Sequence, residues 1–174
     1  YNVKLLGATN SVTNSVTFAN TGALTLGDSS SDTFTFSGGI TATAPSSVTL
    51  AGAFNSGGVV NIGDSNTGIT LADNTSITSA SANTAITLGG VVTGASNTLS
   101  LDAGTSTITF GSTASGLGNT SLTANEVNLS GGFSGSGTLS IIPKTSSLGV
   151  YLGSSDNSNA AVMNLTATEL GYLA

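Results

Sequence analysis

The 174-residue sequence contains no cysteine, histidine, tryptophan or arginine, and only 6% of its residues are charged. Without cysteine the chain has no disulfide framework. Without cysteine or histidine it also lacks the commonest transition-metal ligands and the usual proton carrier at neutral pH. Its two basic side chains, Lys4 and Lys144, are too few to neutralise a phosphate backbone, which excludes nucleic acid as a partner. No apolar run approaches the roughly 18 residues of a membrane-spanning segment, so we expect no transmembrane segment.

In place of charge, the chain carries glycine, serine, threonine and asparagine around short apolar triplets. These triplets are residues 16–18, 24–26, 34–36, 48–50, 69–71, 86–88, 99–101 and 108–110. Each reads apolar, hydroxyl, apolar, which is the period-2 pattern of a strand with one buried face. We therefore predict that the first and third residue of each triplet point into a core.

Comparable triplets recur after about 20 residues, a period typical of repeat architectures. The pairs 48–50 with 69–71 and 86–88 with 108–110 show this spacing. We predict an all-β fold, a parallel β-solenoid of roughly eight coils of about 20 residues. A β-sandwich also has short strands at regular spacing, but it would pair neighbouring strands antiparallel and normally uses longer strands. At the end of the chain, the apolar spacing of 160–174 is compatible with a short helical turn, but we expect a strand followed by a turn.

The acidic residues do not form a recognisable site. Asp28 and Asp32 are the pair close enough to suggest a calcium loop, but the segment lacks both the glycine-rich nonapeptide of calcium-binding solenoids and EF-hand spacing. We interpret it as a solvated turn. The remaining acids are spread singly among turns, which argues against a polysaccharide lyase or a two-carboxylate glycosidase. We expect no catalytic, cofactor-binding or metal site.

Two further patterns have ordinary explanations. Thr-x-Thr phrases at 33–35, 41–43, 107–109 and 166–168 are reminiscent of ice-binding solenoids, but they do not keep a constant coil period. A hydroxyl-bearing strand face explains them. Glycosylation sequons begin at Asn74, Asn119, Asn128 and Asn164; in a sequence this rich in asparagine, serine and threonine, chance produces several.

The last third of the chain contains more distinctive sequence motifs. Residues 137–143 (GTLSIIP), 148–153 (LGVYLG) and 163–174 (MNLTATELGYLA) together resemble the filamentous haemagglutinin type of large bacterial exoprotein, the cargo of two-partner secretion. The segment 99–111 (LSLDAGTSTITFG) is similar to the repeat sequences that form the coils in that family. In many members of that family, a segment like 165–170 (LTATEL) is followed by a DGFSSITIG motif. Here the sequence stops where that motif would begin. The family's N-terminal secretion domain has no counterpart here.

The resemblance implies a right-handed parallel β-helix, export through an outer-membrane pore, and a role as an adhesin shaft or surface fibre. It transfers no functional residue, because the work of a shaft is distributed along its length. We expect 1–174 to be a single solenoid segment, a fragment or repeat unit of a longer chain or filament, located outside the cell or on the bacterial surface.

Function is therefore expected to be structural or adhesive and not enzymatic. Neither end shows a polar cap, so both ends should expose strand edges and favour head-to-tail assembly.

A glycan or host-surface receptor is a further possible partner. The alternative is a carbohydrate-binding solenoid module with Tyr1, Tyr151 or Tyr172 as a stacking surface. Three tyrosines and no tryptophan make a poor sugar platform.

Overall fold

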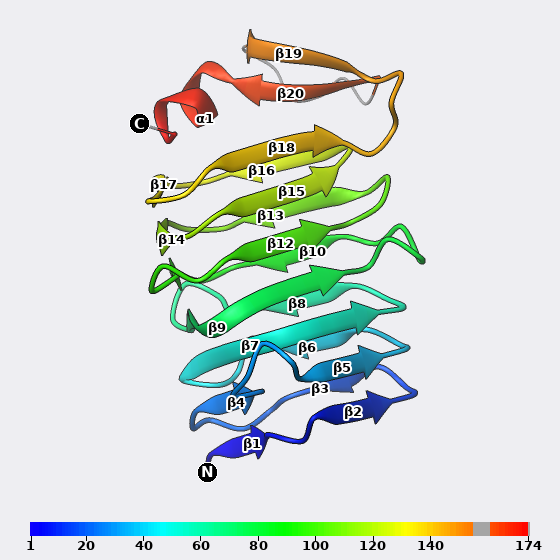
Figure 1. The fold of residues 1–174 in the computed structure, drawn as a ribbon, viewed down its shortest axis with the longest axis vertical. Helices are drawn as coiled ribbons and strands as arrows, with labels where there is room; N and C mark the ends of the chain where they lie inside the picture. The colour runs from blue at the N-terminus through cyan, green and yellow to red at the C-terminus, as the bar shows by residue number, and fades with distance from the viewer. Residues whose placement is uncertain (155–160, 174) are drawn as a thin grey trace.

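The computed structural model describes residues 1–154 and 161–173. The chain winds upward from its N terminus in seven stacked coils, each built from up to three strands (Figure 1). We call the three positions around the coil the first, second and third columns, and number the coils one to seven from the N terminus.

Strands of the first two columns form one continuous sheet. The first column contains β1 (Val3–Leu5), β4 (Leu24–Leu26), β7 (Ser47–Ser56), β9 (Gly68–Thr78), β11 (Val92–Thr93), β14 (Ala114–Leu117) and β17 (Phe133–Gly135). The second column contains β2 (Thr9–Val12), β5 (Thr33–Phe36), the later halves of β7 and β9, β12 (Leu99–Asp102), β15 (Thr120–Ala124) and β18 (Leu139–Pro143).

The third column forms the opposite sheet. It contains β3 (Val16–Thr17), β6 (Ile40–Ala42), β8 (Val60–Ile62), β10 (Ile86–Leu88), β13 (Thr107–Phe110) and β16 (Glu126–Leu129). In Figure 1 the second-column strands run left to right in front and the third-column strands return behind as the chain climbs, so the solenoid is right-handed.

All pairings between the named strands are parallel, which confirms the β-solenoid and excludes the sandwich. Successive coils are offset by between 18 residues, as from Leu117 to Gly135, and 26 residues, as from Val60 to Ile86. The coils are thus slightly longer on average than predicted, and the described residues form seven of them where roughly eight were expected.

The core is a narrow apolar column inside the two sheets. The predicted inward residues of every triplet from 24–26 to 108–110 are at most 1% exposed. Val16 and Phe18, in the first triplet, are only half-buried because they belong to coil one, which has a neighbouring coil on one side only. The inward orientation of the triplets is therefore confirmed.

Two strands are much longer than the three to five residues that the triplets predict. β7 has 10 residues and β9 has 11, because each continues around the corner from the first column into the second. Gly52 makes the corner of β7 with φ +102°, and a Cβ there would collide with the carbonyl oxygen of Asp32 in the coil below. Glycine is the residue that adopts this conformation without strain.

The C-terminal segment forms β19 (Gly149–Ser154), β20 (Val162–Thr166) and α1 (Ala167–Gly171). The predicted strand is present, but the predicted turn is wrong because a short helix follows it. Thr166 and Glu169 form a reciprocal capping box that satisfies the first free N–H groups of this helix. No helix in the described parts of the chain has the length and apolarity needed to cross a bilayer.

Candidate functional surfaces

The outward side chains of the second column form a hydroxyl-rich face, which we call the hydroxyl face. Strand register aligns two rows of partly or fully exposed residues along it. The first row is Thr9, Thr33, Ala53, Ser76, Ser100, Ser121 and Ser140, and the second is Ser11, Thr35, Asn55, Thr78, Asp102, Thr123 and Ile142. Neighbouring strands of a sheet lie about 4.8 Å apart, so each row repeats at that spacing.

Sequence analysis expected a hydroxyl-bearing strand face but did not identify these two rows, because most of their members are single serines or threonines outside Thr-x-Thr phrases. Of those phrases, 33–35 lies on the hydroxyl face, whereas 107–109 lies on the third column and 166–168 at the capped end. The expectation that the phrases do not form one regular array is therefore confirmed. The signal that identifies the face is the recurrence of Ser76, Ser100, Ser121 and Ser140 at the coil period.

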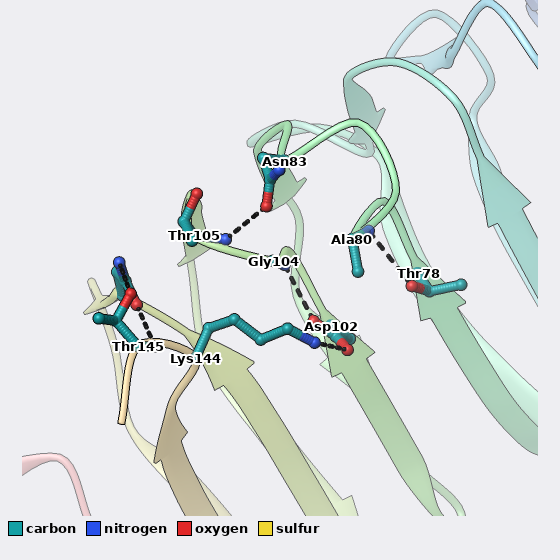
Figure 2. Close-up of polar contacts among 9 residues, drawn as sticks. Thr78, Ala80, Asn83, Asp102, Gly104, Thr105, Lys144 and Thr145 are labelled. Carbon is teal, nitrogen blue, oxygen red and sulfur yellow. Dashed lines mark hydrogen bonds and ion pairs between the residues drawn. The ribbon is translucent and has the colours of Figure 1, made fainter. Parts of the chain in front are cut away.

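One ion pair crosses the upper part of the hydroxyl face. Lys144 in coil seven places its Nζ 3.0 Å from Oδ2 of Asp102 in coil five, so the pair spans coil six (Figure 2). The other carboxylate oxygen of Asp102 accepts the N–H of Gly104 at 2.9 Å. Because the two charges cancel, the pair leaves the hydroxyl face without local net charge.

Asparagines at the corners connect successive coils. Asn83 accepts the N–H of Thr105 through Oδ1 at 2.9 Å, as Figure 2 shows. Asn125 makes two bonds to Thr145, accepting its N–H and donating to its hydroxyl, both at 2.9 Å. The same bridge to a backbone N–H one coil above joins Asn2 to Ala23, Asn74 to Thr98 and Asn119 to Thr138. Two sequon asparagines thus serve as coil-to-coil acceptors, while a third, Asn164, is 1% exposed.

The candidate calcium loop is stabilised by its own backbone. Asp32 is 4% exposed, and its Oδ2 accepts the N–H groups of Asp28 at 3.0 Å and Ser29 at 3.2 Å. Asp73, two coils above, accepts the N–H of Ser30 at 2.8 Å. Hydrogen bonds from the backbone of Asn74 and Ser30 lower the pKa of Asp73. The prediction of a solvated turn is right for Asp28, which is exposed, and wrong for Asp32, which is a buried acceptor.

The three tyrosines do not form one platform. Tyr1 is 84% exposed at the N-terminal end, and Tyr151 is 54% exposed on β19 at the other end of the solenoid (Figure 1). Tyr172 packs against the core beside the final coil. Within the described residues, no group of three or more acidic side chains is arranged to hold a metal ion.

The C-terminal segment covers part of the final coil. The carbonyl of Tyr172 accepts the N–H of Phe133, the first residue of β17, at 2.7 Å. In the coils below, the residues aligned with Phe133 donate to the next coil in the same way: Ile69 to Val91, Val92 to Thr113 and Ala114 to Gly132. Tyr172 therefore occupies the acceptor position of a next coil.

In the third column, the side chain of Glu169 occupies the acceptor position that a next coil would supply. Its Oε1 accepts the N–H of Leu129 in β16 at 3.0 Å, while its Oε2 accepts from the backbone and hydroxyl of Thr166. The counterpart of Leu129 in coil one, Phe18, donates instead to the carbonyl of Thr41 in the next coil. The expectation that neither end is capped is therefore wrong at this end, where β20, α1 and Tyr172 form what we call the C-terminal cap.

A second carboxyl group lies under the cap. Glu126 is half-buried, and its Oε2 lies 3.5 Å from the N–H of Asn164, whereas its Oε1 is buried without a hydrogen-bond partner. Desolvation raises the pKa of Glu126, and the negative charge of Glu169 raises it further. An ionised Glu126 is therefore unfavourable in the capped structure.

Comparison of the chain with protein-family models, with curated proteins and with solved structures gives no match in any of the three. The parallel β-solenoid is thus established by the structure of this chain itself.

Proposed function

We propose that this chain is a non-enzymatic shaft segment of an extracellular bacterial surface fibre or adhesin, joined end to end with further solenoid coils. The observation that carries the proposal is the distribution of exposed apolar side chains. Six of the eight large ones lie in the two terminal parts of the described chain: Tyr1, Leu6, Ile142, Val150, Tyr151 and Leu152. Only Val59 and Val91 lie in between. Exposed apolar side chains are common at interaction sites, so their concentration in the terminal parts of the chain supports contacts at the ends of the solenoid.

The open strand edges support the same arrangement. Among the described residues, β1, β2 and β3 of coil one each pair with a strand on one side only. Unpaired strand edges are templates for pairing with another chain. A stack that binds another stack through unlike ends does not close on itself, so it lengthens into a filament.

The sides of the shaft fit a structural role. The hydroxyl face has no cluster of ionisable groups, and its one ion pair connects two coils of the same chain. The acids at the 28–32 turn accept backbone N–H groups and are used in holding that turn. These arrangements support a non-enzymatic role, because they use the acidic groups to hold coils together. The likeness of 137–174 to filamentous haemagglutinin-type exoproteins supports a bacterial surface location.

Sedimentation velocity over a concentration series, with negative-stain microscopy of the same samples, tests the proposal. We expect unbranched rods with the width of one solenoid, whose length increases with concentration. Particles that associate side by side would contradict end-to-end joining. Saturable, sequence-specific glycan binding on an array would instead favour the carbohydrate-binding alternative.

A further inference from the structure

We propose that a trough on the outer surface of coils four to six binds one strand of a neutral, β-linked polysaccharide. The trough runs parallel to the solenoid axis and crosses β9, β12 and β15, which lie one above another at the front of Figure 1. The inference goes beyond the proposed shaft and does not rest on end-to-end joining, because the trough lies on the side of the solenoid.

Two polar rows form the walls of this trough. One wall, which we call the corner row, consists of Asn74, Thr98 and Asn119. The other wall is part of the first row of the hydroxyl face, namely Ser76, Ser100 and Ser121. The residues between the walls point inward and are at most 4% exposed, so they form the floor: Thr75, Leu99 and Thr120. The trough holds about 160 Å³ beside Asn74 and about 320 Å³ beside Asn119, and the two volumes meet at Thr98 and Ser100.

The asparagines of the corner row present oriented donors. Oδ1 of Asn74 accepts the N–H of Thr98 at 2.9 Å, and Oδ1 of Asn119 accepts the N–H of Thr138 at 3.0 Å. Each bond fixes the plane of the amide, and the Nδ2 groups have no hydrogen-bond partner among the described residues. Within the same residues, no partner is present for the hydroxyls of Ser76, Ser100 and Ser121. The trough therefore offers donors and acceptors that the fold itself does not use.

The charges around the trough favour a neutral ligand. Lys4 lies in coil one, and Lys144 is paired with Asp102. The carboxylate of Asp73, beside Asn74, accepts backbone N–H groups through both of its oxygens. With a net charge of −6 at pH 7, the chain as a whole repels polyanions. Sulfated or uronate polysaccharides therefore fit this surface poorly, whereas an uncharged chain meets no repulsion.

The strands under the trough favour a sugar chain over a peptide. β12 pairs with β9 on one side and with β15 on the other, so its backbone offers no free edge to an added peptide strand. A sugar chain needs no such edge, because its hydroxyls bond to side chains. Its rings carry hydroxyls along both edges and C–H groups on their faces. The edges are complementary to the two polar walls, and a ring face rests on the floor between them.

The repeat of the trough matches an extended polymer. Neighbouring strands lie about 4.8 Å apart, so Asn74 and Asn119, two coils apart, are separated by about 10 Å. In an extended β-linked chain of hexoses each ring is flipped relative to the last, so equivalent hydroxyls recur at every second sugar, over a similar length. One strand thus repeats its contacts from coil to coil. Because a single neutral hydrogen bond contributes little on balance, affinity should increase with the length of the sugar chain.

Isothermal titration calorimetry with defined oligosaccharides tests the ligand class. Cellohexaose and chitohexaose are the β-linked probes, cellobiose tests the dependence on length, and maltohexaose, an α-linked chain that coils, is the control. We expect saturable binding of at least one β-linked hexamer and no measurable binding of cellobiose or maltohexaose. The tighter of the two hexamers identifies whether the sugar carries a hydroxyl or an acetamido group. Binding of neither hexamer, or equal binding of maltohexaose, would overturn the proposal.

Matched variants locate the bound chain. Ser100→Val combined with Ser121→Val removes two wall hydroxyls and should weaken binding by about tenfold or more. Thr87→Val, the same kind of change on the outward face of the opposite sheet, should leave binding unchanged. Asn119→Ala should also weaken binding, whereas Asn2→Ala, which removes the corresponding coil-to-coil bridge outside the trough, should not. Equal effects within either pair would show that the trough is not the binding site.

Sedimentation of the same samples separates this inference from the proposed function. If the protein forms rods but binds neither hexamer, the inference fails and the proposed function stands. If it binds a hexamer and stays monomeric, the inference stands and the carbohydrate-binding alternative replaces the shaft. Rods that also bind through the trough support both, as a shaft with an adhesive side.

Discussion

Phe34 and Phe54 stack one directly above the other in successive coils, with ring centroids 4.7 Å apart and an interplanar angle of 8°. Phe36 extends the group, with its ring centroid 6.3 Å from that of Phe34. All three rings are at most 2% exposed. The core of each coil packs against the cores of its neighbours, so this stack is a main source of adhesion between coils two and three.

Phe54→Ala should therefore destabilise the protein by about 3–5 kcal/mol, through lost burial and the cavity left beside Phe34. Urea unfolding followed by far-ultraviolet circular dichroism measures the change. Asn55→Ala, at the next position and exposed on the hydroxyl face, is the control and should change stability by less than about 0.5 kcal/mol. Comparable losses for the two variants would contradict the assigned strand orientation.

A charge placed in the core should be more damaging than a cavity. Leu101 is fully buried between Ile77 and Leu122, in a column too narrow to admit water to a carboxylate. Leu101→Asp should lower the free energy of unfolding by several kcal/mol. Ser100→Asp, one residue earlier and exposed, should leave it nearly unchanged. Native-state hydrogen exchange of β9, β12 and β15 should show the loss centred on these strands, and a uniform change along the solenoid would contradict it.

The inward face of each strand was predictable from sequence because alternation is a local property. Ile86, Thr87 and Leu88 carry their orientation in three consecutive residues, and stacking on Ile108 and Phe110 follows from the repeat. The number of coils was less predictable. Corner segments vary in length, so the offset between coils ranges from 18 to 26 residues, and a mean period misplaces the register.

The C-terminal cap was missed because its contact with the coils is not local in sequence. The sequence does contain a capping-box signal, Thr166 followed three residues later by Glu169, which indicates a helix start. No local pattern, however, shows that this glutamate also accepts from Leu129, which is 40 residues away in sequence. The contact between Asp102 and Lys144 is equally invisible, because it depends on the sum of two irregular coil lengths.

The corner asparagine bridges should contribute measurably to coil adhesion. Asn125→Ala removes two hydrogen bonds to Thr145 and leaves a backbone N–H without its acceptor, so we expect a loss of about 1–3 kcal/mol. Thr145→Ala removes only one of the two bonds and should cost less. Thermal unfolding of both variants and their double mutant tests this order. If the two single effects simply add, the residues do not interact as the structure shows.

The ion pair between Asp102 and Lys144 should contribute little. Both side chains are about one-third exposed, at 32% and 39%, and such pairs are worth about 0–1 kcal/mol. Lys144→Met should therefore change the unfolding free energy by less than about 1 kcal/mol, and the small effect should shrink as salt concentration rises. Unfolding curves at low and high ionic strength check this. A loss larger than about 2 kcal/mol that is independent of salt would contradict a surface pair.

Acidification should strengthen the C-terminal cap through Glu126. Because the pKa of Glu126 is raised in the folded state, the folded protein binds this proton more tightly than the unfolded chain does. The destabilisation is complete above the folded pKa and disappears as the pH falls below the ordinary value of about 4.5. Exchange at the Leu129 and Phe133 amides measures cap opening, and comparison with a Glu126 variant isolates this contribution from that of Glu169, whose carboxylate also accepts the N–H of Leu129.

Glu126→Gln separates this effect from general acid behaviour. It should tighten the cap at pH 7 relative to the unaltered chain, and this difference should shrink as the pH falls to 4.5, because the amide carries no charge to desolvate. Asp73→Asn is the contrasting control: the pKa of Asp73 is lowered in the folded state, so its carboxylate stabilises the fold above its ordinary pKa of 3.8 and loses that effect as the pH falls. Removing Asp73 should thus weaken the 28–32 turn at neutral pH and leave the cap unchanged. If the difference in cap opening between Glu126→Gln and the unaltered chain is the same at pH 4.5 and pH 7, the charge of Glu126 does not loosen the cap and the desolvation argument is wrong.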